Sequence, residues 1–283
     1  MDFVGRNTKA KKIRKNILIC GMLIIAVIQL FPLIWLFDFS IAKSGDLFAS
    51  DLLIIPDPPQ WGNYITAFVD GKVLKYLFNS VIVNVTTVVG TVIISLLVSY
   101  ACTRMKWKLN KIVMGILLLG MMIPVHATLL PNFILYTRLH ITDSIFALLI
   151  PYIAFAMPQG IFIMSSFLEG VPKSLEEAAV IDGCGVYKVI FLIVLPIMKP
   201  AMVTIAIMTF LNSWNEFVMA MTYLESDKFK TLPFSVLNFA GQYASNYAVQ
   251  FAVMVLTALP ALIVFILLNE QITKGITVGA VKG

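Results

Sequence analysis

Long intervals without a charged side chain are the feature that most limits what this chain can fold into. Four of them have the length of a membrane-spanning helix, which needs about 20 mostly apolar residues. These intervals are 16–37, 76–103, 112–137 and 144–168. Only 13% of the residues are charged, whereas a soluble domain carries about 25%. The chain therefore lacks the charge for a water-facing surface, which excludes a soluble enzyme, a nucleic-acid binder and a disordered scaffold.

Two further spans follow in the second half of the chain. The apolar run 189–198 is too short to cross a bilayer and is typical of an interfacial segment. The fifth span therefore starts near Pro200 and contains one acidic residue, Glu216. In the last charge-free interval, 231–269, the first part is polar and the second part has the length of a span. The sequence thus predicts an all-α membrane protein with six transmembrane helices, over about 17–37, 77–102, 112–134, 144–167, 200–223 and 250–269.

The Lys and Arg residues predict the orientation of these spans. With the N-terminus in the cytoplasm, the inner segments hold 15 of them and the outer segments hold 6, as the positive-inside rule requires. Both termini are therefore expected to be cytoplasmic, and the net charge of +6 reflects topology rather than affinity for nucleic acid. The first 15 residues resemble the start of a signal peptide, but no small-residue cleavage site follows, so we expect an uncleaved first span.

Residues for catalysis, nucleotide binding or metal binding are not evident. The chain contains neither a phosphate-binding loop nor a dinucleotide fingerprint. Its two histidines, His126 and His140, have no cysteine or carboxylate at a metal-ligand spacing, and we interpret both as polar groups near the membrane interface. Cys20, Cys102 and Cys184 all lie near the predicted cytoplasmic side, so no disulfide is expected. We therefore predict no catalytic residues, no metal site and no cofactor in this chain.

The cytoplasmic segment 168–199 carries the most specific pattern. Ser174 and Glu177 form a capping box, which predicts a short helix that begins at Leu175. This helix should end near Asp182, because Gly183 can adopt the left-handed conformation that often follows a helix. A second short helix is expected over 187–194, with Pro196 ending it before the fifth span. On physical grounds alone, an ordinary interfacial amphipathic helix remains an alternative.

The motif in this segment resembles the EAA motif of the inner-membrane permeases of ABC importers. The motif reads EAA, three residues, G, nine residues, then I-x-L-P, and every position is matched: Glu177, Ala178, Ala179, Gly183, Ile193, Leu195 and Pro196. Asp182 before the glycine resembles the carbohydrate-uptake branch of the family. So do Met121–Pro124, Ser213–Phe217 and Gly279–Gly283. Cys184 replaces the usual small residue after the Asp-Gly pair.

This resemblance covers about residues 73–283 and implies a type I ABC importer permease of the maltose and multiple-sugar type. It implies that the motif residues and Asp182 couple to an ATPase, which would bind ATP and Mg²⁺. The implied partners are a second, homologous permease, an ABC ATPase dimer, an extracytoplasmic solute-binding protein, membrane lipid and a sugar. The expected regions are a cytoplasmic basic tail (1–15), a first helix with external loop (16–72), a transmembrane domain (73–270) containing the coupling segment, and a cytoplasmic C-terminal tail (271–283).

Polar side chains in the fifth span are candidates for the substrate pathway. On a continuous helix, Asn212, Asn215 and Glu216 would share one face, next to Trp214. Amide and carboxylate groups beside an indole suit a sugar, but hydrogen bonding to neighbouring helices is an equal alternative. The external segments Ser40–Leu74 and Leu224–Ala248 would face the solute-binding protein.

Two other functions remain to be considered. An ion-coupled secondary carrier would want internal repeats and ionisable groups near the bilayer midplane. The chain has no convincing repeat, and Glu216 is its only plausible buried coupling acid. An intramembrane enzyme would need a Ser/His or paired-Asp arrangement within the spans, which the sequence lacks.

Overall fold

The described part of the computed structural model consists of helices joined by turns and loops, without a strand. The structure describes residues 3–46, 53, 56–105, 107–241 and 246–280, with side chains from 11 to 268 within these ranges. Parts of the predicted tails, of both external segments and of the Gly279–Gly283 motif lie outside them. The helices in order are α1 Phe3–Ser40, α2 Gly62–Val69, α3 Val73–Thr103, α4 Asn110–Leu119, η2 Gly120–Met122, η3 Val125–Thr128, α5 Leu129–Arg138, α6 Phe146–Glu169, α7 Ser174–Ile181, α8 Val186–Lys188, η4 Val189–Val194, α9 Leu195–Ile197, α10 Lys199–Trp214, α11 Val218–Tyr223, α12 Phe234–Leu237 and α13 Tyr247–Ala280.

Four described helices are long and apolar enough to cross a bilayer. They are Lys11–Ser40, Val73–Thr103, Phe146–Glu169 and Tyr247–Leu268, and they confirm the predicted first, second, fourth and sixth spans. Two bent helix pairs raise the number to six if each counts as one span: Asn110–Met122 with Val125–Arg138, and Val186–Ile197 with Lys199–Trp214. The predicted continuous helices over 112–134 and 200–223 are therefore wrong in detail.

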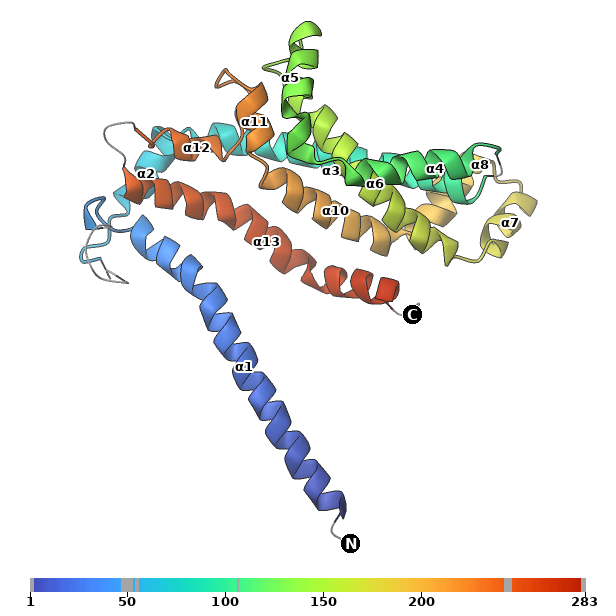
Figure 1. Ribbon diagram of the computed structural model, residues 1–283, viewed down its shortest axis with the longest axis horizontal. Coiled ribbons are helices and arrows are strands. Elements are labelled where there is room, and N and C mark those ends of the chain that lie inside the picture. The colour runs from blue at the N-terminus through green and yellow to red at the C-terminus, as the bar shows by residue number, and fades with distance from the viewer. Residues whose placement is uncertain (1–2, 47–52, 54–55, 106, 242–245, 281–283) are drawn as a thin grey trace. The chain divides into compact units, whose positions relative to one another are not determined.

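The third span is broken at Pro124. Ile123 and Pro124 are extended, with ψ angles of 118° and 117°, and the helix pair on either side is bent by 95°. A proline disfavours the helical conformation of the residue before it, which explains why the helix ends there. Figure 1 shows the result, with α5 projecting away from the direction of α4.

The fifth span is also broken. Helix α10 ends at Trp214, and α11 begins at Val218, so Glu216 lies in the short connection. Its side chain accepts hydrogen bonds from the backbone nitrogens of Met219 (2.7 Å) and Ala220 (3.3 Å). A side chain that satisfies the free N–H groups of a new helix favours a helix start there, which accounts for the interruption.

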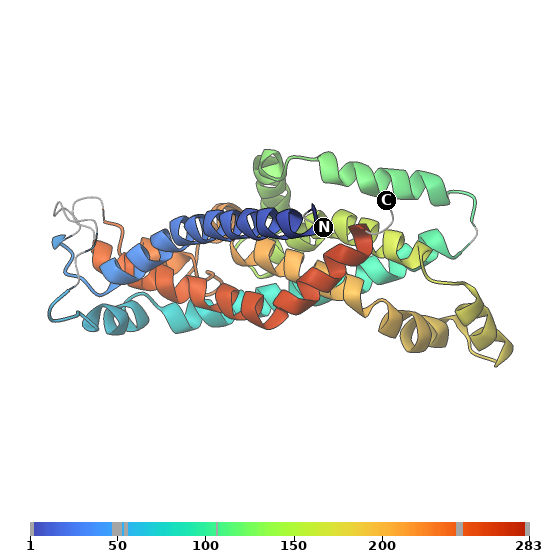
Figure 2. The same ribbon diagram turned by 90° about the horizontal axis from the view of Figure 1, so that it is seen from below.

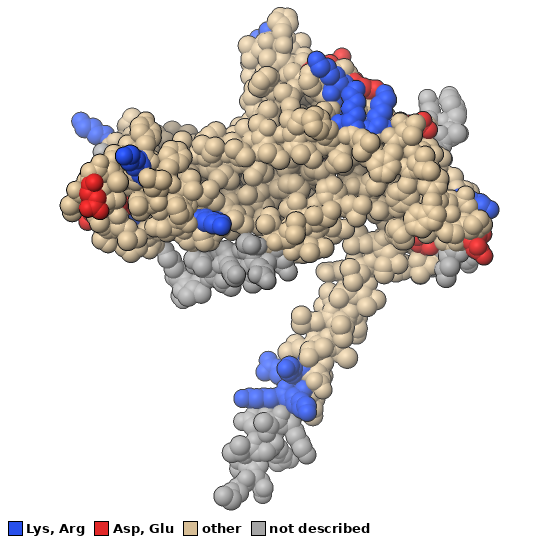
Figure 3. Space-filling view, turned by 180° about the vertical axis from the view of Figure 1, so that it is seen from behind, with Lys and Arg blue, Asp and Glu red and all other residues tan. Residues whose placement is uncertain are grey.

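The chain forms two compact units, residues 1–72 with 235–256 and residues 73–234 with 257–283. The first unit contains α1, which has no buried side chain between residues 11 and 38. The end of α1 is fixed by a hydrogen bond between Ser40 and Tyr64 (2.7 Å) and by the Asn63 amide, which donates to Ser40 O (3.0 Å). Lys and Arg side chains gather on the N-terminal part of α1, and the rest of its visible surface is uncharged (Figure 3).

The second unit is built around α3, α6 and α10, which lie side by side (Figures 1 and 2). Small polar side chains line the buried face of α3: Ser80, Asn84, Thr87, Thr91, Ser95 and Ser99. Such residues allow helices to approach closely. Ser99 Oγ donates to Ile161 O of α6 (3.1 Å), and a Cβ at Gly160 would lie 2.3 Å from Ser95 Oγ. The close contact between α3 and α6 therefore depends on the small size of Gly160 and Ser95.

We expect Gly160→Ala to lower the free energy of unfolding by about 1–3 kcal/mol, because its methyl group overlaps Ser95. Reversible unfolding in mixed micelles measures the change. Ser95→Gly should restore part of the loss, whereas Gly115→Ala on α4, where no neighbouring atom lies within 4 Å of a new Cβ, serves as the control. Equal stability of Gly160→Ala and the wild type would show that α3 and α6 are not packed this closely.

Candidate functional site

Helix α7 begins one residue earlier than predicted. Ser174 is its first residue. Lys173 before it already has helical backbone angles, and no side chain caps the helix start. The backbone nitrogens of Glu176 and Glu177 both donate to Lys173 O (3.0 Å each). The capping box predicted for Ser174 and Glu177 is therefore wrong, because the turn after Pro172 is itself helical and moves the helix start. The Glu177 side chain is left exposed to solvent.

The end of α7 is as predicted. Gly183 adopts a φ of +84°, which only glycine adopts without strain. Its backbone nitrogen donates to Val180 O (3.0 Å), and that of Cys184 donates to Ala179 O (2.9 Å). These two bonds form a Schellman motif, which satisfies the last carbonyl groups of the helix. Gly183 thus sets where α7 ends and where the chain turns.

The motif residues of α7 divide between a buried and an exposed face. Ala179 packs into an apolar core with residues of α3, α6 and η4, whereas Glu177, Ala178, Asp182 and Gly183 are exposed. Two large apolar side chains that the sequence analysis did not select, Ile181 (85% exposed) and Tyr187 (74% exposed), also project into solvent. Exposed apolar side chains among acidic groups are typical of a contact surface for a partner.

The helix after Gly185 differs from the expected short helix over 187–194. It starts at Val186, is π-helical over Val189–Val194 and continues through Pro196 to Ile197. Pro196 does not end it, because it lies in the first turn of α9, where the missing N–H is not needed. The chain instead bends by 76° between Ile197 and Lys199. Ile193 and Leu195 are half-buried, and Pro196 is exposed.

A buried ion pair joins α7 to the end of α3. Arg104 Nε donates to Glu176 Oε1 at 2.7 Å, and the two side chains are only 7% and 11% exposed. Arg104 Nη2 also donates to Leu168 O (2.9 Å) and Val171 O (2.7 Å). A pocket of about 190 Å³ beside this pair is also lined by Glu177 and Lys173. The sequence analysis missed Arg104, because no sequence spacing relates it to the motif.

A larger cavity lies between the helices of the second unit. It has a volume of about 380 Å³ and combines polar and aromatic side chains from α3, η3, α6, α10 and the α10–α11 connection. Its polar lining is Thr87, His126, Tyr152, Gln159, Thr209, Asn212, Ser213 and Glu216, with Phe155 and Met219 among its apolar lining. His126, which was interpreted as an interface residue, therefore lines a cavity.

Only two of the four predicted pathway residues line this cavity, Asn212 and Glu216. Trp214 is 4% exposed, stacks on Phe210 and donates to Thr257 O (3.1 Å). Asn215 is exposed, and its amide donates to Leu211 O of the preceding turn (2.9 Å). The expectation that Asn212, Asn215 and Glu216 share a helix face is wrong, because α10 ends at Trp214.

Glu216 connects three parts of the cavity wall. Besides the two backbone donors of α11, its Oε2 accepts a hydrogen bond from the hydroxyl of Tyr152 on α6 (2.6 Å). A carboxyl group inside a membrane span is costly unless it is satisfied in this way. The carboxyl group therefore holds the α10–α11 connection against α6 and also presents an oxygen-rich edge to the cavity.

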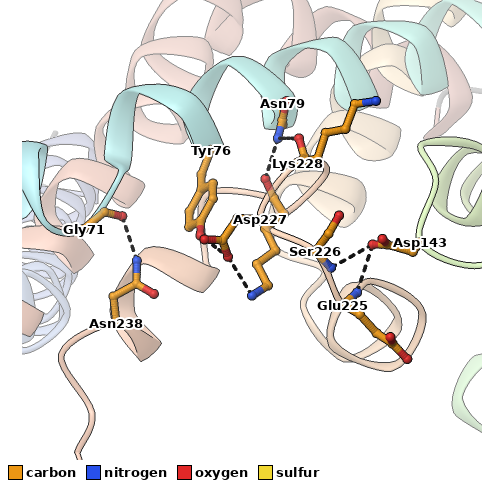
Figure 4. Close-up of polar contacts among 10 residues, drawn as sticks. Gly71, Tyr76, Asn79, Asp143, Glu225, Ser226, Asp227, Lys228 and Asn238 are labelled. Atoms are coloured by element: carbon orange, nitrogen blue, oxygen red, sulfur yellow. Dashed lines mark hydrogen bonds and ion pairs between the residues drawn. The ribbon is translucent and has the colours of Figure 1, made fainter.

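At the far end of the second unit from α7, polar contacts order the connection after α11 (Figure 4). Asp143 Oδ1 accepts hydrogen bonds from the backbone nitrogens of Glu225 (3.0 Å) and Ser226 (2.9 Å). Burial by itself raises the pKa of Asp143, but these bonds, a bond from the Ser226 side chain and the charge of Lys230 lower it by more, so the pKa lies below its ordinary value. Asp227 pairs with Lys230 (2.9 Å).

Within the described residues, no three His, Cys, Asp or Glu side chains are grouped so that they could hold a metal ion. His140 lies in the connection between α5 and α6 with a φ of +56°, away from the cavity lining. The described cysteines are free thiols, and Cys102 is buried. The arrangement combines a polar cavity with a partly exposed short helix, α7, and packed helices join the two.

Comparison with known proteins assigns this arrangement to a family. Residues 91–278 match the family described as binding-protein-dependent transport system inner membrane component. A putative ABC transporter permease of Caldicellulosiruptor sp. (strain Rt8B.4) is 36% identical over 252 residues, which cover 89% of this chain and 91% of that protein. An arabinooligosaccharide permease of Bacillus subtilis is 31% identical, over 92% of this chain and 93% of that protein. A sulfoquinovosyl glycerol permease of Agrobacterium fabrum is also 31% identical, over 92% of this chain and 91% of that protein.

The fold is similar to that of a crystal structure of a bacterial ABC transporter that imports the acidic polysaccharide alginate. The TM-score is 0.81 at 21% identity, over 92% of this chain and 97% of that chain. The resemblance noted in the sequence is confirmed. Permeases of this kind are multi-pass proteins of the cytoplasmic membrane and are not themselves enzymes, because a separate subunit hydrolyses ATP. The chain belongs to the family of binding-protein-dependent transport system inner membrane components, the permease subunits of ABC transporters.

Proposed function

We propose that this chain is the permease subunit of an ATP-driven sugar importer and forms half of its translocation pathway. The main support is the exposed surface of α7 and the turn after it, where Glu177, Ala178, Asp182 and Gly183 match the EAA motif. Exposed apolar side chains lie among these residues. We propose that these residues couple the permease to an ABC ATPase dimer, which binds ATP and Mg²⁺. We assign the positioning of the segment to Ala179, Ile193, Leu195 and Pro196.

The cavity is suited to a sugar. Hydroxyl groups of a sugar need donors and acceptors, which Gln159 and Asn212 supply, and its C–H faces pack on aromatic rings such as that of Phe155. Relatives named for arabinooligosaccharides and sulfoquinovosyl glycerol support a carbohydrate substrate. We assign Asn212 and Glu216 to the pathway wall, and Trp214 and Asn215 to support of the helix end.

The remaining partners follow from the same proposal. A second, homologous permease would complete the pathway, and lipid would cover the apolar exterior. A solute-binding protein would dock on the external segments Ser40–Leu74 and Leu224–Ala248, where Asp143 holds the Glu225 and Ser226 backbone in place. A related alginate transporter has been crystallised with its periplasmic protein bound to an alginate pentasaccharide. An ion-coupled carrier has no support among the relatives, which are ABC transporter permeases.

Reconstitution tests this function. The permease pair, the ATPase and the binding protein are placed in proteoliposomes and assayed with a panel of radiolabelled oligosaccharides. Uptake should require ATP and the ATPase, and a protonophore should leave it unchanged while ATP is held constant. Prompt collapse of uptake with the protonophore would favour the ion-coupled carrier instead.

Gly183→Pro should leave membrane insertion intact and abolish association with the ATPase. Proline fixes φ near −65° and has no N–H, so it can neither adopt the observed φ of +84° nor donate to Val180 O. Co-purification of the ATPase measures the effect. Gly185→Ala is the matched control, because Gly185 has an ordinary φ of −72° and open space around it. Normal co-purification with Gly183→Pro would count against the coupling assignment.

Glu216→Gln should reduce uptake while preserving assembly of the complex. A glutamine keeps one oxygen acceptor for the α11 backbone, but its amide nitrogen cannot accept the Tyr152 hydroxyl hydrogen bond. Initial uptake rates and size-exclusion profiles provide the two measurements. Met221→Ala, which alters an exposed side chain of α11 outside the cavity lining, should change neither. Unchanged transport kinetics in Glu216→Gln would leave Glu216 with a packing role only.

A further inference from the structure

Arg104 makes contacts that reach beyond its own helix. It follows the last residue of α3, yet its three side-chain hydrogen bonds are to Glu176 of α7 and to the carbonyl oxygens of Leu168 and Val171. Leu168 lies in the last turn of α6, and its carbonyl oxygen also accepts a hydrogen bond from the Val171 backbone nitrogen (3.0 Å). One guanidinium group therefore joins the ends of α3 and α6 to the start of α7.

Apolar packing surrounds this junction. Leu96 and Tyr100 of α3, Leu168 of α6 and Ala179 of α7 belong to one buried cluster, which continues into η4 and α10. Close-packed side chains transmit displacement because they leave little free volume. The hydrogen bonds of Arg104 also fix the relative orientation of the three helix ends, since a planar guanidinium group holds each acceptor in a set direction.

In the middle of α3, directional bonds are scarce. The buried hydroxyl oxygens of Thr87, Thr91 and Ser95 have no hydrogen-bond partner among the described residues. Thr87 lies at the cavity. Helix α3 is therefore held by specific polar bonds at its α7 end and again at its other end, where Tyr76, Asn79 and Ser80 bond to residues 227–232. Between these ends it is held mainly by packing, which carries a shift imposed at the α7 end along the helix to Thr87.

The covalent route from α7 through the following chain to the α10 wall of the cavity is less direct. It passes through the turn at Gly183, the π-helix η4 and the 76° bend before α10. A displacement of α7 along this route has to be carried around the bend before it reaches Asn212 or Ser213 on α10. The Arg104 junction instead connects α7 to α3, a helix that is not adjacent to it in the sequence.

We propose that Arg104 is a positioning residue that transmits movement of α7 into α3 and so to the Thr87 side of the cavity. This inference rests on the proposed function. The ATPase would then act on two walls of the cavity by two routes, α3 through Arg104 and α10 through the chain itself. Coupling between distant sites requires such a connected network. Lysine cannot replace Arg104, because it lacks the forked donors.

The test compares two reporters on the two walls. Thr87→Cys on α3 and Ser213→Cys on α10 are each introduced into a complex whose permease lacks Cys20, Cys102 and Cys184. Maleimide labelling rates are measured for the full complex with its ATPase, with and without MgATP and vanadate. Each reporter is combined with Arg104→Gln, Glu176→Gln or both substitutions, and Lys111→Gln, an exposed basic residue on α4, is the charge control.

The double variant separates coupling from folding. A single substitution leaves one buried charge without its partner, which destabilises the protein, whereas neutralising both is often tolerated. In Arg104→Gln with Glu176→Gln, we expect the ATP-dependent change in labelling at Thr87→Cys to fall about tenfold, while the change at Ser213→Cys and ATPase co-purification remain. A full response at Thr87→Cys in that variant would overturn the inference. No response of either reporter in the background without the Arg104 and Glu176 substitutions would instead count against the proposed function.

Discussion

Two spans of this protein are broken within the membrane domain, and the backbone groups freed at each break have to be satisfied without lipid contact. In hydrocarbon, irregular backbone is tolerated only where it is buried in protein or lines a water-filled cavity. Both breaks meet this condition at the same place. Val125 and His126 follow the first break and Glu216 lies in the second, and all three line the cavity of about 380 Å³. The breaks, the cavity and the carboxyl group of Glu216 are therefore parts of one arrangement.

The other half of the site depends on α7, which has one buried and one exposed face. Ala179 anchors α7 in the apolar core, while Glu177 and Asp182 remain free for a partner. Arg104 fixes the start of this helix to α3 and α6. Contacts of this kind connect the exposed face to helices that border the cavity, and the proposed coupling rests on them.

Local patterns predicted much of this site. The motif Glu177–Gly183 was visible because its residues are close in sequence, and Gly183 adopts the expected left-handed conformation. Expectations failed where the exact start or end of a helix decided the outcome. Ser174 was a sound cap by pattern, but the helical turn after Pro172 moved the helix start, and Asn215 and Trp214 looked equivalent to Asn212 until the end of α10 separated them.

The sequence by itself determined the membrane class, the positions of four of its six predicted spans and the EAA-type motif, because these follow from charge-free length and from spacing within a few turns. Only the tertiary structure decided that Arg104 lies on Glu176, 72 positions farther along the chain, and that His126, Tyr152 and Glu216 line one cavity. Hydropathy reports how costly a residue is in lipid but not which helix lies beside it. Helix packing sets those neighbours, so the polar junctions that join the spans appear only once the helices are assembled.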